Sequence, residues 1–183
     1  MRPPEDVQAA LTVLGARPTG VEGEGVIDLR RTNLGGAELD ELNFEGADLR
    51  KADLTRATLF GGRFADVWFD DGDLTEADLT AGDFENSTFL SSNLKKATMV
   101  GGNFLNSEFT SADMSGADLS SGEGEEETKL GYAKLSGVNL ADAQSDRRHP
   151  LCGRPERGSK RQGAGRQSHP DQSECRRPDR YFP

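Results

Sequence analysis

The chain has 183 residues, of which 33% are hydrophobic and 7% aromatic, and its formal net charge at pH 7 is −10. A compact globule of this length is normally richer in apolar residues, so the composition favours either disorder or an elongated repeat with a thin core. No window approaches the run of about 18 apolar residues that spans a membrane. No signal peptide opens the chain, so we expect a cytoplasmic protein.

The first segment with a regular pattern is PPEDVQAALTVLG, residues 3–15. Its apolar residues Val7, Ala10, Leu11 and Leu14 have helical spacing, with proline and acidic residues before them and Gly15 after them. The pattern predicts a short helix whose apolar stripe caps the structure that follows. We therefore assign residues 1–25 to a capping helix and a linker.

A period of five begins at Leu29, and every fifth residue from there to Leu119 is Leu, Phe or Met. We call these residues the centres. The residue two before each centre is small in most units, and the residue between is commonly Asp, Asn, Thr or Glu. A period of five fits neither the 3.6-residue period of a helix nor the two-residue period of a strand.

A second period, of twenty residues, explains the first. One column of centres is large and follows mostly glycine: Phe44, Phe64, Phe84 and Phe104, after Leu42, Gly62, Gly82 and Gly102. Another is of medium size and follows alanine: Leu39, Leu59, Leu79, Met99 and Leu119, after Ala37, Ala57, Ala77, Ala97 and Ala117. An interior of fixed cross-section requires this matching of large with small. The pattern predicts coils of four short sides, with these two columns as the core ladder.

The run GADLRKADLTRATLF and its neighbours resemble the pentapeptide repeat family, whose repeat unit is A(D/N)LXX. The resemblance covers residues 27–142. It implies an all-β fold, a right-handed quadrilateral parallel β-helix in which centres and small residues point inward. Such a bacterial solenoid has a one-dimensional core, and its ends need caps.

The lead-in RPPEDVQAALTVLG is similar to that of bacterial members of this family with membrane-spanning segments further upstream. This second resemblance implies a chain truncated at its front. Its full-length form would then be membrane-associated, which is the alternative to a cytoplasmic protein.

The repeat is interrupted once, after Leu119. Position 124 should be a centre, but it is a glycine within SSGEGEEETKL, and the register resumes at Leu130. We predict an acidic loop at 120–129 that replaces one side of a coil and adds one extra residue, within a repeat domain spanning 26–143. Its acidic residues are candidates for an interaction surface, with a tolerated surface bulge as the alternative: Glu123, Glu125, Glu126 and Glu127.

Trp68 occupies an outward position in VWFDD, between inward Val67 and Phe69, and Asp70 and Asp71 follow it. Exposed tryptophan is enriched at interfaces. We predict that Trp68, Asp70 and Asp71 contact a partner protein or a second subunit in a homodimer. The alternative is an isolated exposed aromatic residue, which is common.

The negative charge of the repeat falls mostly on two adjacent sides. Some pentapeptide repeat proteins mimic duplex DNA and occupy the DNA site of gyrase, and this resemblance suggests an acidic DNA mimic that binds gyrase or another DNA-binding enzyme. However, the outward aspartates occupy positions that the repeat itself prefers. We therefore favour a structural or protein–protein interaction rod, and we expect no direct nucleic-acid binding because such a rod repels phosphates.

Groups for catalysis do not converge within the repeat. Both histidines and both cysteines follow residue 143, namely His149, His169, Cys152 and Cys175. The paired glycines are not followed by the GK[ST] of a phosphate-binding loop. We predict a non-enzymatic protein with no catalytic, cofactor-binding or metal-binding residue.

Residues 144–183 form a basic tail with few apolar residues, which predicts disorder. Yet Pro150, Pro155 and Pro170 keep the period of five from Leu140. Proline codons read one base later can encode leucine, so the tail is alternatively the product of a single-base slip near Gln144. The gene sequence tests this, because codons that cannot encode the repeat in the shifted frame contradict it.

Overall fold

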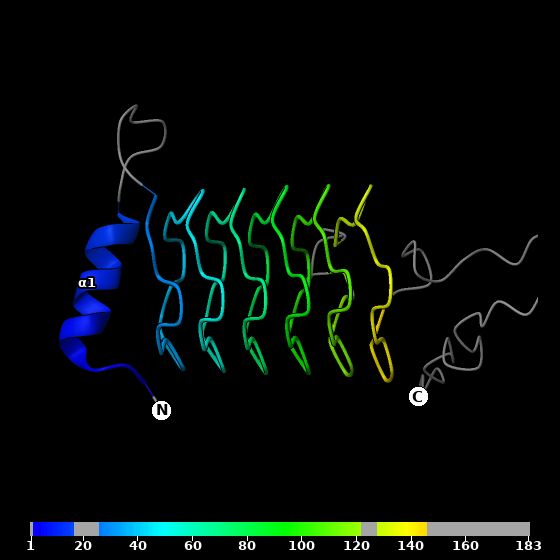
Figure 1. Cartoon of the computed structure of the whole chain (residues 1–183), viewed down its shortest axis with the longest axis horizontal. Helices are drawn as coiled ribbons and strands as arrows, with labels where there is room; N and C mark the ends of the chain where they lie inside the picture. Colours follow the sequence, from blue (N-terminus) through cyan, green and yellow to red (C-terminus); the bar gives the residue numbers. More distant parts are fainter. Residues whose placement is uncertain (1, 17–25, 122–127, 146–183) are drawn as a thin grey trace, which may run out of the picture.

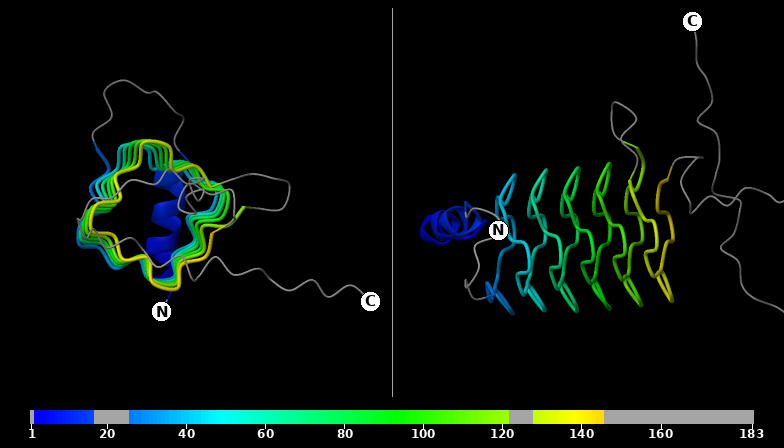
Figure 2. Two further views of the ribbon diagram at one scale, coloured as in Figure 1. Left: turned by 90° about the vertical axis from the view of Figure 1, so that its right-hand side faces the viewer. Right: turned by 90° about the horizontal axis from the view of Figure 1, so that it is seen from above.

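The computed structural model describes residues 2–16, 26–121 and 128–145. Helix α1, Glu5–Gly15, lies across one end of a stack of coils (Figure 1). The coils are held together by isolated β-bridges, each made by a single residue per side, so α1 is the one regular element in the described ranges. Viewed along the stack, the coils superimpose (Figure 2).

The bridges are parallel, and they join each residue before a centre to its equivalent one coil later. Asp28 pairs with Asp48, and Asp48 pairs in turn with Trp68. Each bridge carries two backbone hydrogen bonds, and in the Asp28–Asp48 bridge these are Leu29 N–H to the Asp48 carbonyl at 2.8 Å and Asp48 N–H to the Ile27 carbonyl at 2.9 Å. Backbone polar groups are thus satisfied along the stack, at the spacing of about 4.8 Å typical of paired strands.

The turn between sides explains the period of five. The second residue after each centre from Leu29 to Met114 has a positive φ, as at Arg31 (58°), Lys51 (62°) and Gly36 (68°). A residue in this left-handed conformation bends the chain away from the extended direction of the side before it. A centre, its two neighbours and a two-residue turn therefore complete one side.

The core contains two phenylalanine ladders on adjacent sides, together with ladders of Leu and Met. In the first, Phe64, Phe84 and Phe104 stack at centroid distances of 5.3 and 4.9 Å. The second comprises Phe69, Phe89 and Phe109, which stack at 4.8 and 4.7 Å. Every member of the predicted core ladder is buried: Phe44, Phe64, Phe84, Phe104, Leu39, Leu59, Leu79, Met99 and Leu119.

Buried serines support the second ladder. Ser87 Oγ donates to the Phe64 carbonyl at 2.6 Å and accepts from Val67 N–H at 3.1 Å. Ser107 Oγ donates to the Phe84 carbonyl at 2.8 Å. Each hydroxyl thus occupies the small position before a phenylalanine without being left unpaired.

The interruption after Leu119 differs from our interpretation of the sequence. Lys129 pairs with Asn103, a separation of 26 residues where other coils have 20, so no column loses its bridge and the coil contains a six-residue insertion. Thr128 restores the register, because its Oγ1 accepts from Gly101 N–H at 3.0 Å. Replacing a whole side would have left Asn103 unpaired and Phe104 uncovered, which explains why the ladder resumes in the same column.

Helix α1 packs through only part of the predicted apolar stripe. Leu11 and Gly15 are buried and Val7 is half-buried, whereas Ala10 and Leu14 are exposed. A Cβ on Gly15 would lie 2.6 Å from Leu42 Cβ. Glycine allows this close approach, and the helix therefore turns the Val7–Leu11–Gly15 face to the first coil.

Candidate interaction surface

Trp68 lies in the outward column of bridge residues that precedes the centres Leu49, Phe69 and Phe89. Its neighbours in this column are polar: Asp28, Asp48, Thr88 and Glu108. The Trp68 side chain is 39% exposed. A large aromatic side chain is thus fixed on an outer wall by the β-bridges on either side of it.

Arg50 covers one side of the indole. Its guanidinium carbon lies 5.7 Å from the ring centroid, within the range of a cation–π contact. The same guanidinium is held by Asp48, with Nε to Oδ1 at 2.9 Å and Nη2 to Oδ2 at 2.5 Å. Asp48 is 5% exposed, so a buried carboxylate fixes the arginine that contacts Trp68.

The two acidic residues after Trp68 have different roles. Asp70 Oδ1 accepts a hydrogen bond from Leu90 N–H on the next coil at 3.0 Å, so this carboxylate supports the turn. Asp71 lies 3.7 Å from Lys51 Nζ, and both side chains are more than half-exposed. The structure therefore brings Trp68, Asp70 and Asp71 to one corner of the rod, where Asp71 is the more accessible acid.

Arginine bonding holds two carboxyl pKa values low. The side-chain hydrogen bonds from Arg30 lower the pKa of Asp28 to about 2. Those from Arg50 lower the pKa of Asp48, against the opposing effect of desolvation. Both carboxylates are consequently ionised at neutral pH.

Many outward acids also have a structural bond. Asp53, Asp73 and Asp78 each accept, through Oδ1, the backbone N–H of the residue two positions later at 3.0 Å. These bonds satisfy turn donors that face outward. They explain why the repeat prefers aspartate before its centres, independently of any ligand.

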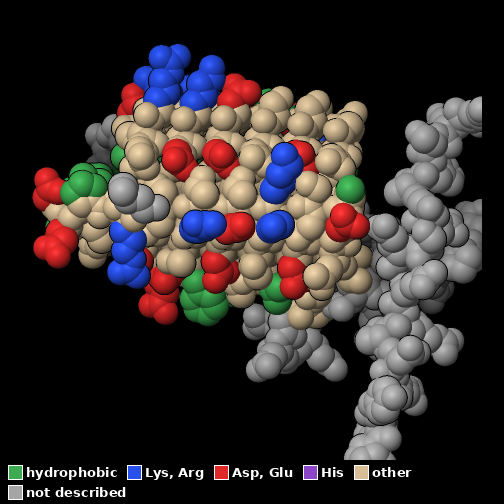
Figure 3. Space-filling model, turned by 90° about the horizontal axis from the view of Figure 1, so that it is seen from below, with side chains coloured by type: hydrophobic (Ala, Val, Ile, Leu, Met, Phe, Trp, Pro, Cys, Tyr) green, Lys and Arg blue, Asp and Glu red, His purple; other side chains and the backbone are tan. Residues whose placement is uncertain are grey.

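Charges of both signs lie in rows along the rod (Figure 3). Arg56 Nε, for example, donates to Glu76 Oε2 on the next coil at 2.7 Å. The side-chain hydrogen bond between them lowers the pKa of Glu76 and raises that of Arg56. Such ion pairs between opposite charges reduce the electrostatic potential of the surface around them.

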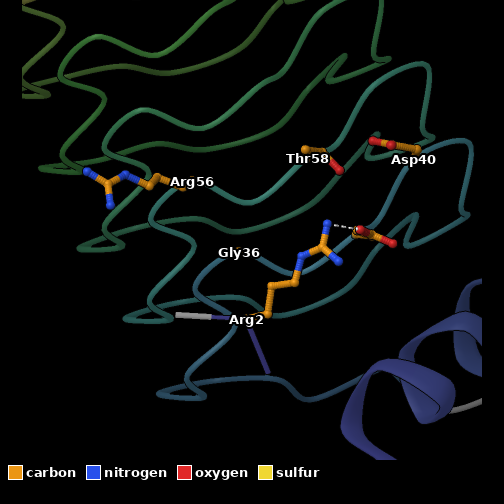
Figure 4. Close-up of a pocket in the computed structure, with 6 residues that line it drawn as sticks. Arg2, Gly36, Asp40, Arg56 and Thr58 are labelled. Atoms are coloured by element: carbon orange, nitrogen blue, oxygen red, sulfur yellow. Dashed lines mark ion pairs between the residues drawn. The ribbon is translucent and has the colours of Figure 1, made fainter. Parts of the chain in front are cut away.

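A hollow of about 350 Å³ lies near the first coils, between Arg2, Asp40, Arg56 and Thr58. The Arg2 side chain extends across it to form an ion pair with Glu38 at 2.5 Å (Figure 4). Because both of these side chains are more than half-exposed, the ion pair contributes little to stability.

The other candidates for the interaction surface fall outside the described residues: Glu123, Glu125, Glu126 and Glu127. Both histidines and both cysteines also lie outside them: His149, His169, Cys152 and Cys175. Within the described ranges, no cluster of three His, Cys, Asp or Glu residues is placed to hold a metal ion. Nor do those ranges contain a helix long and apolar enough to span a membrane.

Sequence reasoning missed a basic corner beside Trp68, formed by Arg30, Arg31, Arg50 and Lys51. These four residues line one hollow together with Asp28. Arg30 and Arg50, and likewise Arg31 and Lys51, are separated by one twenty-residue coil. The period of twenty, applied to the turn positions, would have predicted this juxtaposition.

Comparison with known families identifies the repeat. A family profile described as pentapeptide repeats matches in eight copies, over residues 27–66, 72–104 and 91–121. The chain belongs to the pentapeptide repeat family.

Several solved structures of pentapeptide repeat proteins are similar to the chain. Rfr23 from the cyanobacterium Cyanothece 51142 is 21% identical, with a TM-score of 0.51 over 65% of this chain and 87% of that one. A protein from the Arabidopsis thaliana thylakoid lumen is 27% identical over 59% of this chain and 75% of that one, with a TM-score of 0.29. QnrB1, a plasmid-mediated fluoroquinolone resistance protein, is 14% identical over 65% and 82%, with a TM-score of 0.25.

The likeness to Rfr23 extends to the fold, the right-handed β-helix of pentapeptide repeat proteins. No match to the chain was found among curated proteins.

Proposed function

We propose that this pentapeptide repeat protein is a non-enzymatic rod that binds another protein through the corner containing Trp68, Asp70 and Asp71. The observation that carries the proposal is the exposed Trp68, in a column where the neighbouring bridge residues are polar. Arg50 and Asp48 hold the indole in place, so its ordering costs little conformational entropy on binding.

Trp68→Ala is expected to abolish capture of the partner from a cell extract by the immobilised full chain. Phe60→Ala is the matched control, because Phe60 is also an exposed aromatic residue (45%) but lies on another column. Quantitative mass spectrometry should identify a protein that the wild type and the Phe60 variant retain equally and the Trp68 variant loses at least tenfold. If every captured protein responds equally to both substitutions, the proposal is wrong.

In a homodimer, the protein bound at the Trp68 corner would be a second copy of this chain. In that case sedimentation of the purified chain should show a dimer that dissociates in the Trp68→Ala variant. If both the wild type and the Trp68→Ala variant sediment as monomers, the partner is a different protein.

The alternative function is an acidic mimic of DNA that binds gyrase or another DNA-binding enzyme. The excess of acidic residues on two adjacent sides favours it, whereas the hydrogen bonds that Asp78, Asp83 and Asp118 on those sides make to the turns give these acids a structural reason. A supercoiling assay with gyrase at several salt concentrations tests this alternative. No inhibition at micromolar protein rules it out.

We further propose that each coil is quadrilateral and that α1 caps the first coil. Four bridge columns per twenty residues support the quadrilateral form. The cap is supported by Gln8, whose side-chain amide donates to the Glu38 carbonyl at 2.6 Å and accepts from Glu38 N–H at 3.0 Å. Gly15 adds a carbonyl that accepts Asn43 N–H at 2.8 Å. These bonds to α1 satisfy backbone groups of the first coil that a preceding coil would otherwise bind.

Leu11→Glu tests the cap. Burying a carboxylate against the first coil is expected to detach α1 and to lower the free energy of unfolding by about 2–4 kcal/mol. Hydrogen exchange should accelerate at Glu38 and Asn43 N–H, while the exposed control Val13→Glu should leave both protected. Unchanged exchange in the Leu11 variant would contradict the cap.

The same domain boundaries remain our proposal: a cap and linker at 1–25, the repeat at 26–143 with its acidic loop, and the tail at 144–183. The bridges begin at Asp28, which supports the start of the repeat, and the last one pairs Asp118 with Gln144, one residue beyond the proposed end. The described residues end at 145, so both the disordered tail and the single-base slip remain predictions.

A further inference from the structure

The basic corner defined above surrounds a hollow of about 480 Å³ at the beginning of the rod. Arg30, Arg31, Arg50, Lys51 and Asp28 line it. The chain as a whole is strongly acidic, with a net charge of −10. Four basic side chains around one hollow are therefore a local reversal of the charge of the protein.

Two of these side chains, Arg30 and Arg50, are held in place by carboxylates of the same outer wall. Arg30 Nε and Nη2 donate to the two oxygens of Asp28 at 2.9 and 2.6 Å, and Arg50 repeats the arrangement on Asp48 one coil later. Asp48 also lies 3.5 Å from Arg30 Nε, so one carboxylate joins both guanidinium groups. The two arginines thus form a ladder whose geometry is set before any ligand arrives.

The two carboxylates that hold the arginines do not balance the basic residues of the hollow. The four basic residues together with Asp28 and Asp48 have a charge of 4 − 2 = +2, before the neighbouring Asp70 and Asp71 are counted. A guanidinium carries five N–H donors, and the bonds to Asp48 engage Nε and Nη2 of Arg50, which leaves Nη1 to donate outward. Lys51 also approaches Asp71 at 3.7 Å, but both side chains are more than half-exposed, so this ion pair is weak and yields readily to a ligand.

We propose that the basic corner binds a phosphate dianion, either free phosphate or a phosphate monoester. A charge of about −2 matches the local excess, and tetrahedral phosphate oxygens accept from several arginine and lysine donors at once. A single carboxylate would balance only half of that charge. The site lies beside the Trp68 corner and goes beyond the proposed function, since it specifies a ligand chemistry that no protein-binding role requires.

The chain contains a built-in reporter for this binding. Trp68 is the one tryptophan in the sequence, and the Arg50 guanidinium lies 5.7 Å from its ring centroid. A ligand that accepts hydrogen bonds from Arg50 should therefore change the intrinsic tryptophan fluorescence.

The test titrates the full chain with inorganic phosphate and, separately, with phenyl phosphate at pH 7.5 and constant ionic strength. We expect a saturable fluorescence change with both probes. The double variant Arg31→Ala/Lys51→Ala should weaken both affinities at least tenfold. The control Lys95→Ala/Lys96→Ala removes the same charge from a corner outside the hollow and should bind as the wild type does.

The two probes distinguish the sources of the phosphate. Equal affinities assign a free phosphate, whereas tighter binding of phenyl phosphate assigns an ester on a larger molecule, and both results support the proposal. Equal weakening by the two double variants overturns it, because the effect is then one of net charge. Sodium acetate binding as tightly as phosphate, or no saturable change at all, also overturns it.

Discussion

Replacing Phe84 with alanine is expected to lower the free energy of unfolding by about 3–5 kcal/mol. The Phe84 ring stacks between Phe64 at 5.3 Å and Phe104 at 4.9 Å, and it contacts Phe69 and Phe89 of the second ladder at 6.1 Å each. Removing it leaves a cavity in the middle of both ladders. Because each coil of a solenoid contacts only its neighbours, no distant part of the core can compensate.

Chemical denaturation followed by circular dichroism measures this loss. Phe60→Ala is the control, because Phe60 is 45% exposed and its loss should change stability by less than about 1 kcal/mol. Equal destabilisation by the two substitutions would show that the ladder contributes no more than a surface phenylalanine.

The core of this pentapeptide repeat protein follows from two periods in the sequence. The period of five locates the inward centres, and the period of twenty stacks them, so the alternation of Phe84 with Gly82 predicts a column of rings beside a column without side chains. These patterns are robust because every coil repeats the same steric requirement.

Features that occur once were less predictable. The orientation of α1 depends on a single close approach of Gly15 to Leu42, which the helical spacing of apolar residues does not encode. The insertion after Leu119 has two possible registers in the sequence, and the pairing of Lys129 with Asn103 distinguishes them. Both depend on contacts between distant segments.

The surface illustrates a different limit. Trp68 was identifiable because it interrupts a polar position, but the basic corner was hidden when charge was summed over a whole side. The bases of the first two coils cancel against Asp70, Asp71 and other acids further along that side. Position along the rod, and not the net charge of a side, determines what can bind there.

Replacing Gly82 with valine tests the packing from the opposite direction, by overfilling the core. A Cβ at Gly82 would lie 2.5 Å from Phe84 Cε2 and 3.3 Å from the Leu59 carbonyl oxygen. The ring cannot move away easily, since Phe64 and Phe104 hold it on both faces. We expect the free energy of unfolding to fall by about 3 kcal/mol, near the upper end for overpacked cores.

Gly131→Val is the control, because a Cβ there would meet the flexible end of Leu105 at 2.8 Å, and Gly131 is exposed. The cost at Gly82 should also depend on the ring itself. In a Phe84→Leu background, the same Gly82→Val change should be less destabilising by about 1–3 kcal/mol, the size of coupling expected between residues in contact. An unchanged cost in that background would mean that the backbone, and not the ring of Phe84, requires glycine at this position.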